Sequence, residues 1–164
     1  MLFECLHFEN IWDLKVYANC FSESLRLEPP VMQSSFCMLT ETQMIGSVVI
    51  QKGDSFSIDM HLLHTNKNEW QEPSKFIPER FDPESPYYLT PAGKKRNPLS
   101  FSPFLGGKRI CLGKTFAEAS SKIVGPTILM NFEFEFSDPE MMKKPKPNNN
   151  MLVIHEPHVL VKIK

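Results

Sequence analysis

The 164-residue sequence lacks an excess of charge of either sign, a long apolar run and any Cys-x-x-Cys pair. Its 18 basic and 19 acidic residues nearly cancel, which argues against nucleic acid as a partner. No apolar stretch approaches the roughly 20 residues that a membrane-spanning helix needs. Nothing at the N-terminus resembles a signal peptide, so we expect an intracellular protein with reduced thiols at its scattered cysteines, Cys5, Cys20, Cys37 and Cys111.

Glycine is scarce, at seven residues, whereas proline is frequent, at 14. This balance favours long irregular connections over a compact helical bundle. Prolines recur throughout residues 65–100, so we expect neither a long helix nor a long strand there. A loop of that length usually serves a site, and the side chains of Trp70, Phe76 and Phe81 are predicted to order it.

One amphipathic helix is predicted near the N-terminus. Apolar residues recur at helical spacing over residues 11–25, with Asn10 as the N-cap and two prolines at 29–30 as the stop. Glu23 and Arg26 lie three residues apart and therefore on one face of this helix. On an exposed surface such a pair contributes only about 0.2–0.5 kcal/mol.

Short strands are predicted on either side of residues 51–54, where Gln-Lys-Gly-Asp supplies a hairpin turn. Residues 132–136 alternate strictly between phenylalanine and glutamate and predict a further strand. Residues 151–164 predict a terminal hairpin that turns at Glu156-Pro157. We therefore expect an α+β fold that is mainly α with small β-sheets, in the order helix, sheet, long loop, helix and sheet.

A second helix is predicted after Cys111, beginning near Lys114, with Phe116, Ile123 and Val124 facing inward. Gly125-Pro126 is expected to interrupt and kink it. The reason is that proline inside a helix loses a hydrogen bond and costs about 3 kcal/mol or more.

Cys111 lies between a glycine-containing loop and this second helix. The amides at a helix N-terminus and the cations at Lys108, Arg109 and Lys114 favour its thiolate. Such a thiolate is a candidate nucleophile, redox sensor or metal ligand. The five histidines lie far away in sequence, so the sequence neither supplies nor excludes a general base for a nucleophile.

Two histidine pairs have three-residue spacing, His61 with His64 and His155 with His158. The first pair follows a predicted strand and the second lies in a proline turn, so both are interpreted as polar turn residues rather than zinc ligands. A further possibility for Cys111 is to be the sole protein ligand on one side of an iron porphyrin.

Residues 104–113, Phe-Leu-Gly-Gly-Lys-Arg-Ile-Cys-Leu-Gly, resemble the haem-binding loop of the cytochrome P-450 haem-thiolate monooxygenases, whose pattern is F-x-x-G-x-R-x-C-x-G. Chance agreement at every fixed position of this pattern has odds on the order of 10⁻⁵ to 10⁻⁴ in a chain of this length. One departure is Leu105, which occupies a position where the family usually has a small or polar residue. The matching residues are Phe104, Gly107, Arg109, Cys111 and Gly113.

The resemblance extends beyond this loop. Residues 23–26, Glu-Ser-Leu-Arg, are similar to the family's E-x-x-R on its helix K, and residues 76–81 are similar to its P-E-R-F segment. The resemblance implies a buried network of Glu23, Arg26 and Arg80 that holds the long loop over the proximal side of the haem. Removing one partner of such a buried network costs about 3–5 kcal/mol, unlike the loss of a surface pair.

The resemblance also implies the roles of the loop residues. Cys111 would be the axial ligand of the haem iron, and its electron-rich sulfur favours O–O cleavage. Arg109 would pair with a haem propionate, and Phe104 would shield the sulfur from water. The tight turn and the close approach of the backbone would depend on Gly106, Gly107 and Gly113.

By this resemblance the function is that of a haem-dependent monooxygenase, which inserts one atom of O₂ into a small organic substrate. Its electrons would come from a flavoprotein reductase docked on the proximal face. Residues 94–96, Lys-Lys-Arg, are interpreted as part of a solvated loop. The alternative is that they form, with Lys108 and Lys114, a basic patch for that partner.

From about Leu14 onward the chain is similar to the C-terminal third of such an enzyme. We therefore expect residues 1–164 to be an incomplete, C-terminal portion of a single cytochrome P-450 domain. The family's oxygen-activating helix and a membrane anchor of the parent protein would lie N-terminal to it. The alternatives are a non-catalytic truncated remnant that binds haem weakly or not at all, and a redox-sensing thiol protein that uses Cys111.

Overall fold

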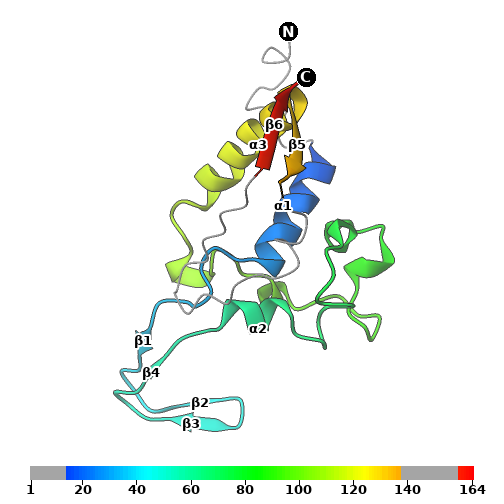
Figure 1. The fold of residues 1–164 in the computed structure, drawn as a ribbon. Helices are drawn as coiled ribbons and strands as arrows, with labels where there is room; N and C mark the ends of the chain where they lie inside the picture. The colour runs from blue at the N-terminus through cyan, green and yellow to red at the C-terminus, as the bar shows by residue number, and fades with distance from the viewer. Residues whose placement is uncertain (1–13, 138–158) are drawn as a thin grey trace.

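The computed structural model of the chain describes residues 14–137 and 159–164. Two helices, α1 (Lys15–Leu27) and α3 (Lys114–Asn131), pack against each other at its centre. A two-stranded sheet lies at one end of this pair, and a β-ribbon extends away at the other end (Figure 1). The predicted class, helices with small antiparallel sheets, is confirmed. Among the helices of the described residues, none has the length and apolar character needed to cross a membrane.

Helix α1 is shorter at its start than the sequence predicts. The amide of Ala18 donates the first helical hydrogen bond to the carbonyl of Leu14, at 2.9 Å, and Leu14 is the N-cap. The prediction that Asn10 caps this helix is therefore wrong, and Asn10 itself lies outside the described residues. The end is as predicted, because the helix stops at Leu27, ahead of the two prolines at 29–30.

The ribbon contains four short strands, β1 (Cys37–Met38), β2 (Gln43–Ile45), β3 (Val48–Ile50) and β4 (Ser55–Phe56). Strand β2 pairs with β3, and β1 pairs with β4, both antiparallel.

The predicted pairing across residues 51–54 is wrong, because β3 folds back onto β2 through the two-residue loop at Gly46-Ser47. Gly46 has a φ of 62°, a conformation that favours glycine in tight hairpin loops. The turn at 51–54 does form, with a hydrogen bond from the Asp54 amide to the Gln51 carbonyl at 3.1 Å. It connects β3 to β4, but β4 pairs with β1 and not with β3.

The long segment after the ribbon, over residues 65–100, contains no long helix or strand, as predicted. Helix α2 (Met60–His64) begins where the side chain of Asp59 accepts a hydrogen bond from the Leu62 amide, at 2.8 Å. Three 3₁₀ turns follow, each with a proline in its first turn, where the fixed φ of proline suits a helix start. They are η2 (Pro78–Phe81), η3 (Pro86–Tyr88) and η4 (Pro98–Ser100).

Of the aromatic side chains predicted to order this segment, Trp70 is buried and Phe76 is exposed. Trp70 is only 1% exposed, and its ring lies 6.0 Å from that of Phe81 and 6.3 Å from that of Phe101. Phe76 is 53% exposed, so the prediction that it helps to order the segment is wrong. Trp70, Phe81 and Phe101 together form the aromatic core of this half of the molecule.

Helix α3 runs without interruption through Pro126 to Asn131, so the predicted break at Gly125-Pro126 is wrong. Pro126 is buried, and the hydroxyl of Thr127 donates to the Ile123 carbonyl at 2.7 Å. Tertiary packing on α1 and local side-chain bonds thus offset the hydrogen bond that proline cannot make.

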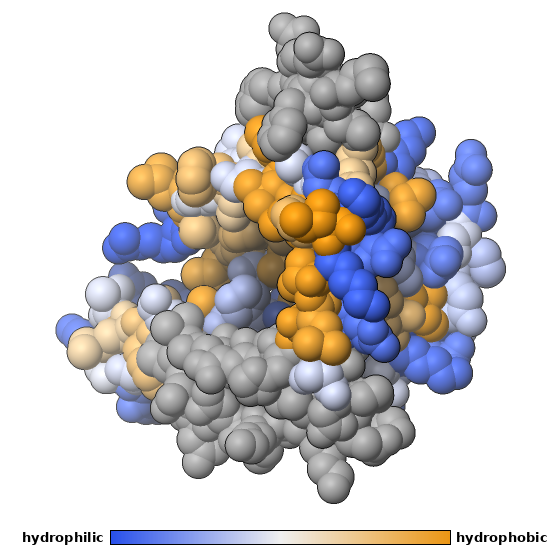
Figure 2. All heavy atoms as spheres, turned by 45° about the horizontal axis from the view of Figure 1, so that its top comes forward, coloured by the Kyte–Doolittle hydropathy of each residue, from blue (hydrophilic) through white to orange (hydrophobic). Residues whose placement is uncertain are grey.

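The apolar side chains of α3 that the sequence placed inward are exposed. Phe116 is 78%, Val124 54% and Ile123 39% exposed. Apolar side chains also form patches between strongly polar ones on the face shown in Figure 2. The described part of the chain leaves these side chains exposed to different degrees, whereas Ser121 and Gly125 of α3 meet Tyr17 of α1.

Gly125 of α3 lies directly against the Tyr17 side chain of α1. A Cβ at this position would lie 1.9 Å from the hydroxyl oxygen of Tyr17, whose hydroxyl is 2.9 Å from that of Ser121. Gly125→Ala is therefore expected to lower the free energy of unfolding by about 1–3 kcal/mol through overpacking. Urea denaturation followed by circular dichroism measures this change.

The matched control is the same substitution in a Tyr17→Ala background. Without the Tyr17 ring only the helix propensity remains, which favours alanine over glycine by about 1 kcal/mol. Gly125→Ala should then be neutral or stabilising. Equal losses in both backgrounds would show that Tyr17 does not limit the space at Gly125.

Strand β5 (Phe132–Phe136) follows α3 directly, as predicted, and pairs antiparallel with β6 (Val159–Ile163) from Phe132↔Ile163 to Phe136↔Val159. The terminal residues therefore form a strand, but its observed partner is β5. The predicted turn at Glu156-Pro157 lies outside the described residues.

Candidate functional site

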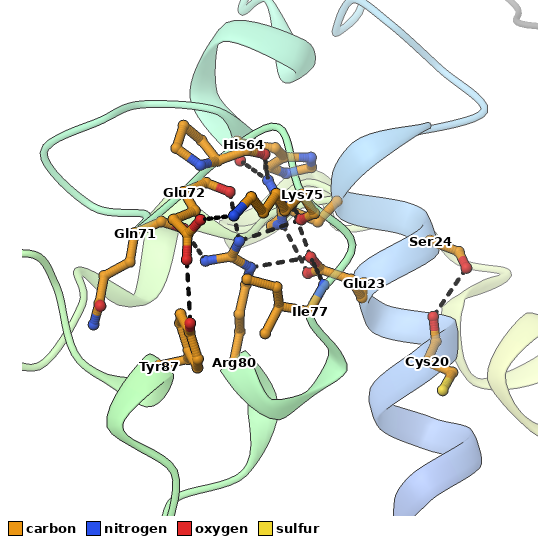
Figure 3. Close-up of polar contacts among 12 residues, drawn as sticks. Cys20, Glu23, Ser24, His64, Gln71, Glu72, Lys75, Ile77, Arg80 and Tyr87 are labelled. Atoms are coloured by element: carbon orange, nitrogen blue, oxygen red, sulfur yellow. Dashed lines mark hydrogen bonds and ion pairs between the residues drawn. The ribbon is translucent and has the colours of Figure 1, made fainter. Parts of the chain in front are cut away.

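The structure brings Glu23, Arg26 and Arg80 together in a fully buried cluster between α1 and η2 (Figure 3). The Glu23 carboxylate accepts from Nε of Arg26 at 2.7 Å, from a terminal nitrogen of Arg26 at 2.8 Å and from Nε of Arg80 at 3.0 Å. It also accepts from the Ile77 amide at 2.9 Å. One carboxylate thus neutralises part of the charge of two buried guanidinium groups.

The remaining donors of the two arginines bind backbone carbonyls at the end of α2 and in the segment between α2 and η2. Arg26 donates to His64 at 2.9 Å, to Pro73 at 2.7 Å and to Lys75 at 3.1 Å. Arg80 donates to the carbonyls of Gln71, Glu72 and Lys75. Burial lowers the pKa of Arg80, and its ion pair with Glu23 opposes that shift. Because the donors of the cluster are used in this way, it fixes the path of residues 71–77.

Trp70 lies between two guanidinium groups. The Cζ atom of Arg26 is 5.2 Å from its ring centre and that of Arg96 is 4.5 Å away. Arg96 also stacks on Tyr88, at 5.4 Å, and donates to the Tyr87 carbonyl at 2.8 Å. Arg96 is therefore half-buried in the long segment, and its predicted place in a solvated loop or an exposed basic patch is wrong.

His64, interpreted from the sequence as a polar turn residue, is fully buried at the end of α2. Its Nε2 accepts a hydrogen bond from the Ser102 amide at 3.0 Å, and its ring centre lies 5.4 Å from that of Phe101. Burial and, less strongly, the charge of Arg26 lower the pKa of His64 from 6.5 to about 4, with a smaller contribution from His61. The ring is therefore neutral at physiological pH, and sequence spacing contained no signal of this role.

The lowered pKa of His64 predicts a loss of stability in mild acid. From pH 6.5 down to about 4, the unfolded chain binds a proton at His64 that the folded chain excludes, so stability falls as the pH falls. Over this window the wild type should lose about 3 kcal/mol more free energy of unfolding than His64→Gln. Urea denaturation at both ends of the window measures the difference, and equal losses would contradict a neutral buried imidazole.

Cys111 lies between the 3₁₀ turn η5 (Gly107–Arg109) and α3, and its thiol is exposed. Its amide donates to the Phe104 carbonyl at 2.9 Å, which closes the loop. Its carbonyl accepts from the Lys114 amide at 3.3 Å, just before the first turn of α3. A Cβ on Gly113 would lie 3.8 Å from the sulfur, at ordinary van der Waals distance, so Gly113 lies directly beside the thiol.

The other predicted loop residues surround Cys111 along the chain. Phe104 is half-buried, whereas Gly106, Gly107 and Arg109 are exposed. Gly107 has a φ of 63°, a conformation that glycine adopts without strain. Leu105 has a φ of 61°, where a branched apolar residue is strained, which gives a physical reason why a small or polar residue suits this position.

The surroundings of Cys111 fit a flat apolar group that carries an iron atom. Leu112 is fully exposed, and Phe116 on the first turn of α3 is 78% exposed, so apolar surface lies on the helix side of the thiol. Within residues 14–137 and 159–164, no cluster of three histidine, cysteine or acidic side chains could hold a metal ion. A lone thiolate suits an iron that a porphyrin already holds, and the exposed Arg109 could pair with a carboxylate of that group.

Comparison with known proteins agrees with this fit. The family model for "Cytochrome P450" matches residues 3–163. Cytochrome P450 4F6 from Rattus norvegicus is 35% identical over 87% of this chain, and cytochrome P450 4F12 from Homo sapiens is 36% identical over 79%. Leukotriene-B4 omega-hydroxylase 3 from Mus musculus is 32% identical over 87%. The chain spans 25%, 23% and 26% of these relatives, respectively.

Solved structures show the same fold. A retinoic acid-bound cyanobacterial CYP120A1 has a TM-score of 0.77, with 24% identity over 97% of this chain and 35% of its own. The cytochrome P450 CYP102L1 has a TM-score of 0.79, with 24% identity over 97% of this chain and 34% of its own. Because the family model matches nearly the whole chain, this protein belongs to the cytochrome P450 family.

Proposed function

We propose that the chain is the haem-binding, C-terminal portion of one cytochrome P450 monooxygenase domain, with Cys111 as the axial ligand of the iron. The observation that carries this proposal is an exposed thiol, flanked by exposed apolar side chains, at the end of a glycine-containing loop. When bound, haem would supply the activation of O₂ for insertion of one oxygen atom into an organic substrate.

The residues of the chain would hold and orient that group. The bond from the Cys111 amide to the Phe104 carbonyl would orient the thiol, and Gly113 lies beside it. The half-buried ring of Phe104 would limit the access of water to the sulfur, and Arg109 would bind a propionate. The cluster of Glu23, Arg26 and Arg80 would keep the long segment, and through it the loop, in place.

The partners of the reaction would be a flavoprotein reductase and a small organic substrate. For the reductase, the exposed side chains of Lys94, Lys95 and Lys108 offer positive charge, whereas Arg96 and the half-buried Lys114 are less available. For the substrate, the name of the mouse relative, leukotriene-B4 omega-hydroxylase 3, makes leukotriene B4 the first compound to test.

The second candidate is a non-catalytic protein that binds haem weakly or not at all. The exposed apolar side chains of α3 favour it, since surface of this kind belongs to an interface rather than to solvent. A chain with such a surface would require a partner or would aggregate.

The deciding experiment is the reduced, carbon monoxide-bound spectrum of the haem-loaded chain. We expect the red-shifted Soret band of thiolate-bound haem in the wild type and its complete loss in Cys111→Ser. The matched control is Cys37→Ser, since Cys37 is also an exposed free thiol but lies on β1. The band should persist in this control.

Two results would overturn the proposal. One is a band that survives Cys111→Ser, because the iron would then have another ligand. The other is a wild-type chain that never binds haem, which would favour the non-catalytic candidate.

A further inference from the structure

His64 connects the buried cluster to the loop that carries Cys111. Its backbone carbonyl accepts a hydrogen bond from Arg26 at 2.9 Å. Its side chain, through Nε2, accepts one from the Ser102 amide at 3.0 Å. One residue therefore contacts the Glu23, Arg26 and Arg80 cluster with its backbone and the start of the loop with its ring.

The segment held by His64 leads directly to Cys111 through backbone bonds. The Ser102 carbonyl accepts from the Leu105 amide at 2.9 Å, which forms the turn at residues 102–105. The Phe104 carbonyl, inside that turn, accepts from the Cys111 amide at 2.9 Å. A shift of Ser102 would therefore move the carbonyl that orients Cys111.

The protonation of His64 shows what its ring is suited to do. Because Nε2 accepts a hydrogen bond, the neutral ring must carry its proton on Nδ1. Within the described part of the chain, the buried Nδ1 has no hydrogen-bond partner. An unpaired buried N–H is unfavourable, so packing against Phe101 alone would favour an apolar ring such as phenylalanine. The feature that favours histidine at this position is the Nε2 atom, which accepts the hydrogen bond from the Ser102 amide.

We propose that His64 is a positioning residue that sets the place of the Cys111 thiol by holding the Ser102 amide. It acts on Cys111 through the turn at residues 102–105. The effect of His64 on haem ligation rests on the proposed function. The hydrogen bond by which His64 holds the loop does not.

Two substitutions separate the acceptor from the ring. His64→Phe keeps a ring of similar size against Phe101 but removes the acceptor, whereas His64→Gln keeps an acceptor oxygen near the place of Nε2. The matched control is His61→Phe, because His61 is exposed on the same helix.

The first measurement is hydrogen–deuterium exchange of the backbone amides in the haem-free chain. We expect exchange at Ser102 and Cys111 to be about five- to tenfold faster in His64→Phe, as for the loss of one hydrogen bond. His64→Gln and His61→Phe should retain the wild-type rates. The amide of Ile77, which donates to Glu23 in the buried cluster, should not change in any variant.

The second measurement is the carbon monoxide-bound spectrum of the haem-loaded chain. The fraction of haem with the thiolate-type Soret band should fall several-fold in His64→Phe and return in His64→Gln. If the wild type binds no haem, the proposed function fails, and the exchange rates still decide whether His64 holds the loop.

The inference is overturned if Ser102 exchanges at the same rate in His64→Phe and in the wild type. It is also overturned if Ile77 accelerates as much as Ser102 and glutamine does not restore either amide, because His64 would then be a general packing residue. Should His64→Phe not fold, His64→Gln decides: wild-type exchange supports the inference, and fast exchange at Ser102 overturns it.

Discussion

Glu23→Gln is expected to lower the free energy of unfolding by about 3–5 kcal/mol, close to the whole stability of a marginal domain. Glutamine keeps the size of the side chain but removes the charge that two guanidinium groups share. Arg26 and Arg80 are both fully buried, and each forms an ion pair with Glu23 that the substitution would remove. The amide of glutamine would also place N–H donors against arginine donors.

Urea denaturation monitored by circular dichroism measures this loss. The matched control is Glu41→Gln, which makes the same change of charge at an exposed position on the β-ribbon side of the molecule. This control should lie within about 0.5 kcal/mol of the wild type. A loss of less than about 1 kcal/mol in Glu23→Gln would mean that water reaches the cluster.

Trp70→Ala is expected to lower the free energy of unfolding by about 3–5 kcal/mol. The indole is 1% exposed, contacts the rings of Phe81 and Phe101, and lies between the guanidinium groups of Arg26 and Arg96. Its removal would leave a cavity and would end both cation–π contacts.

Two further variants test the cause of this effect. Phe76→Ala removes an aromatic side chain that is 53% exposed in the same segment, and it should cost less than about 1 kcal/mol. Trp70→Phe keeps a ring in the same place and removes an indole N–H that has no partner in the described residues, so it should lose less than alanine. An equal loss in Trp70→Ala and Phe76→Ala would contradict the aromatic core.

The pair of Glu23 and Arg26 shows what local sequence spacing can and cannot predict. Spacing along a helix places the two side chains on one face, but it does not predict whether that face is buried or exposed to solvent. The same pair contributes a few tenths of a kcal/mol on a surface and supports a whole segment when it is buried with Arg80. Arg80 lies 57 residues from Glu23, so only the folded chain, or a family pattern that encodes it, brings the three together.

Two of the wrong predictions share this physical origin. Gly125-Pro126 reads locally as a break, yet Tyr17 of α1 packs on Gly125 and the helix continues. Arg96 reads as part of a basic run, yet the aromatic rings around it make it a packing residue. In both cases a partner distant in sequence overrides the local preference.

By itself, the sequence determined the family, the order of helices and sheets, and the loop that presents Cys111. It could do so because glycine, proline and the cysteine motif act through the backbone within a few residues. Only the tertiary structure decided which side chains are buried, and with that the neutral state of His64 and its bond to Ser102. Burial is set by what covers a side chain, and the cover of His64 comes from elements that lie up to 38 residues away.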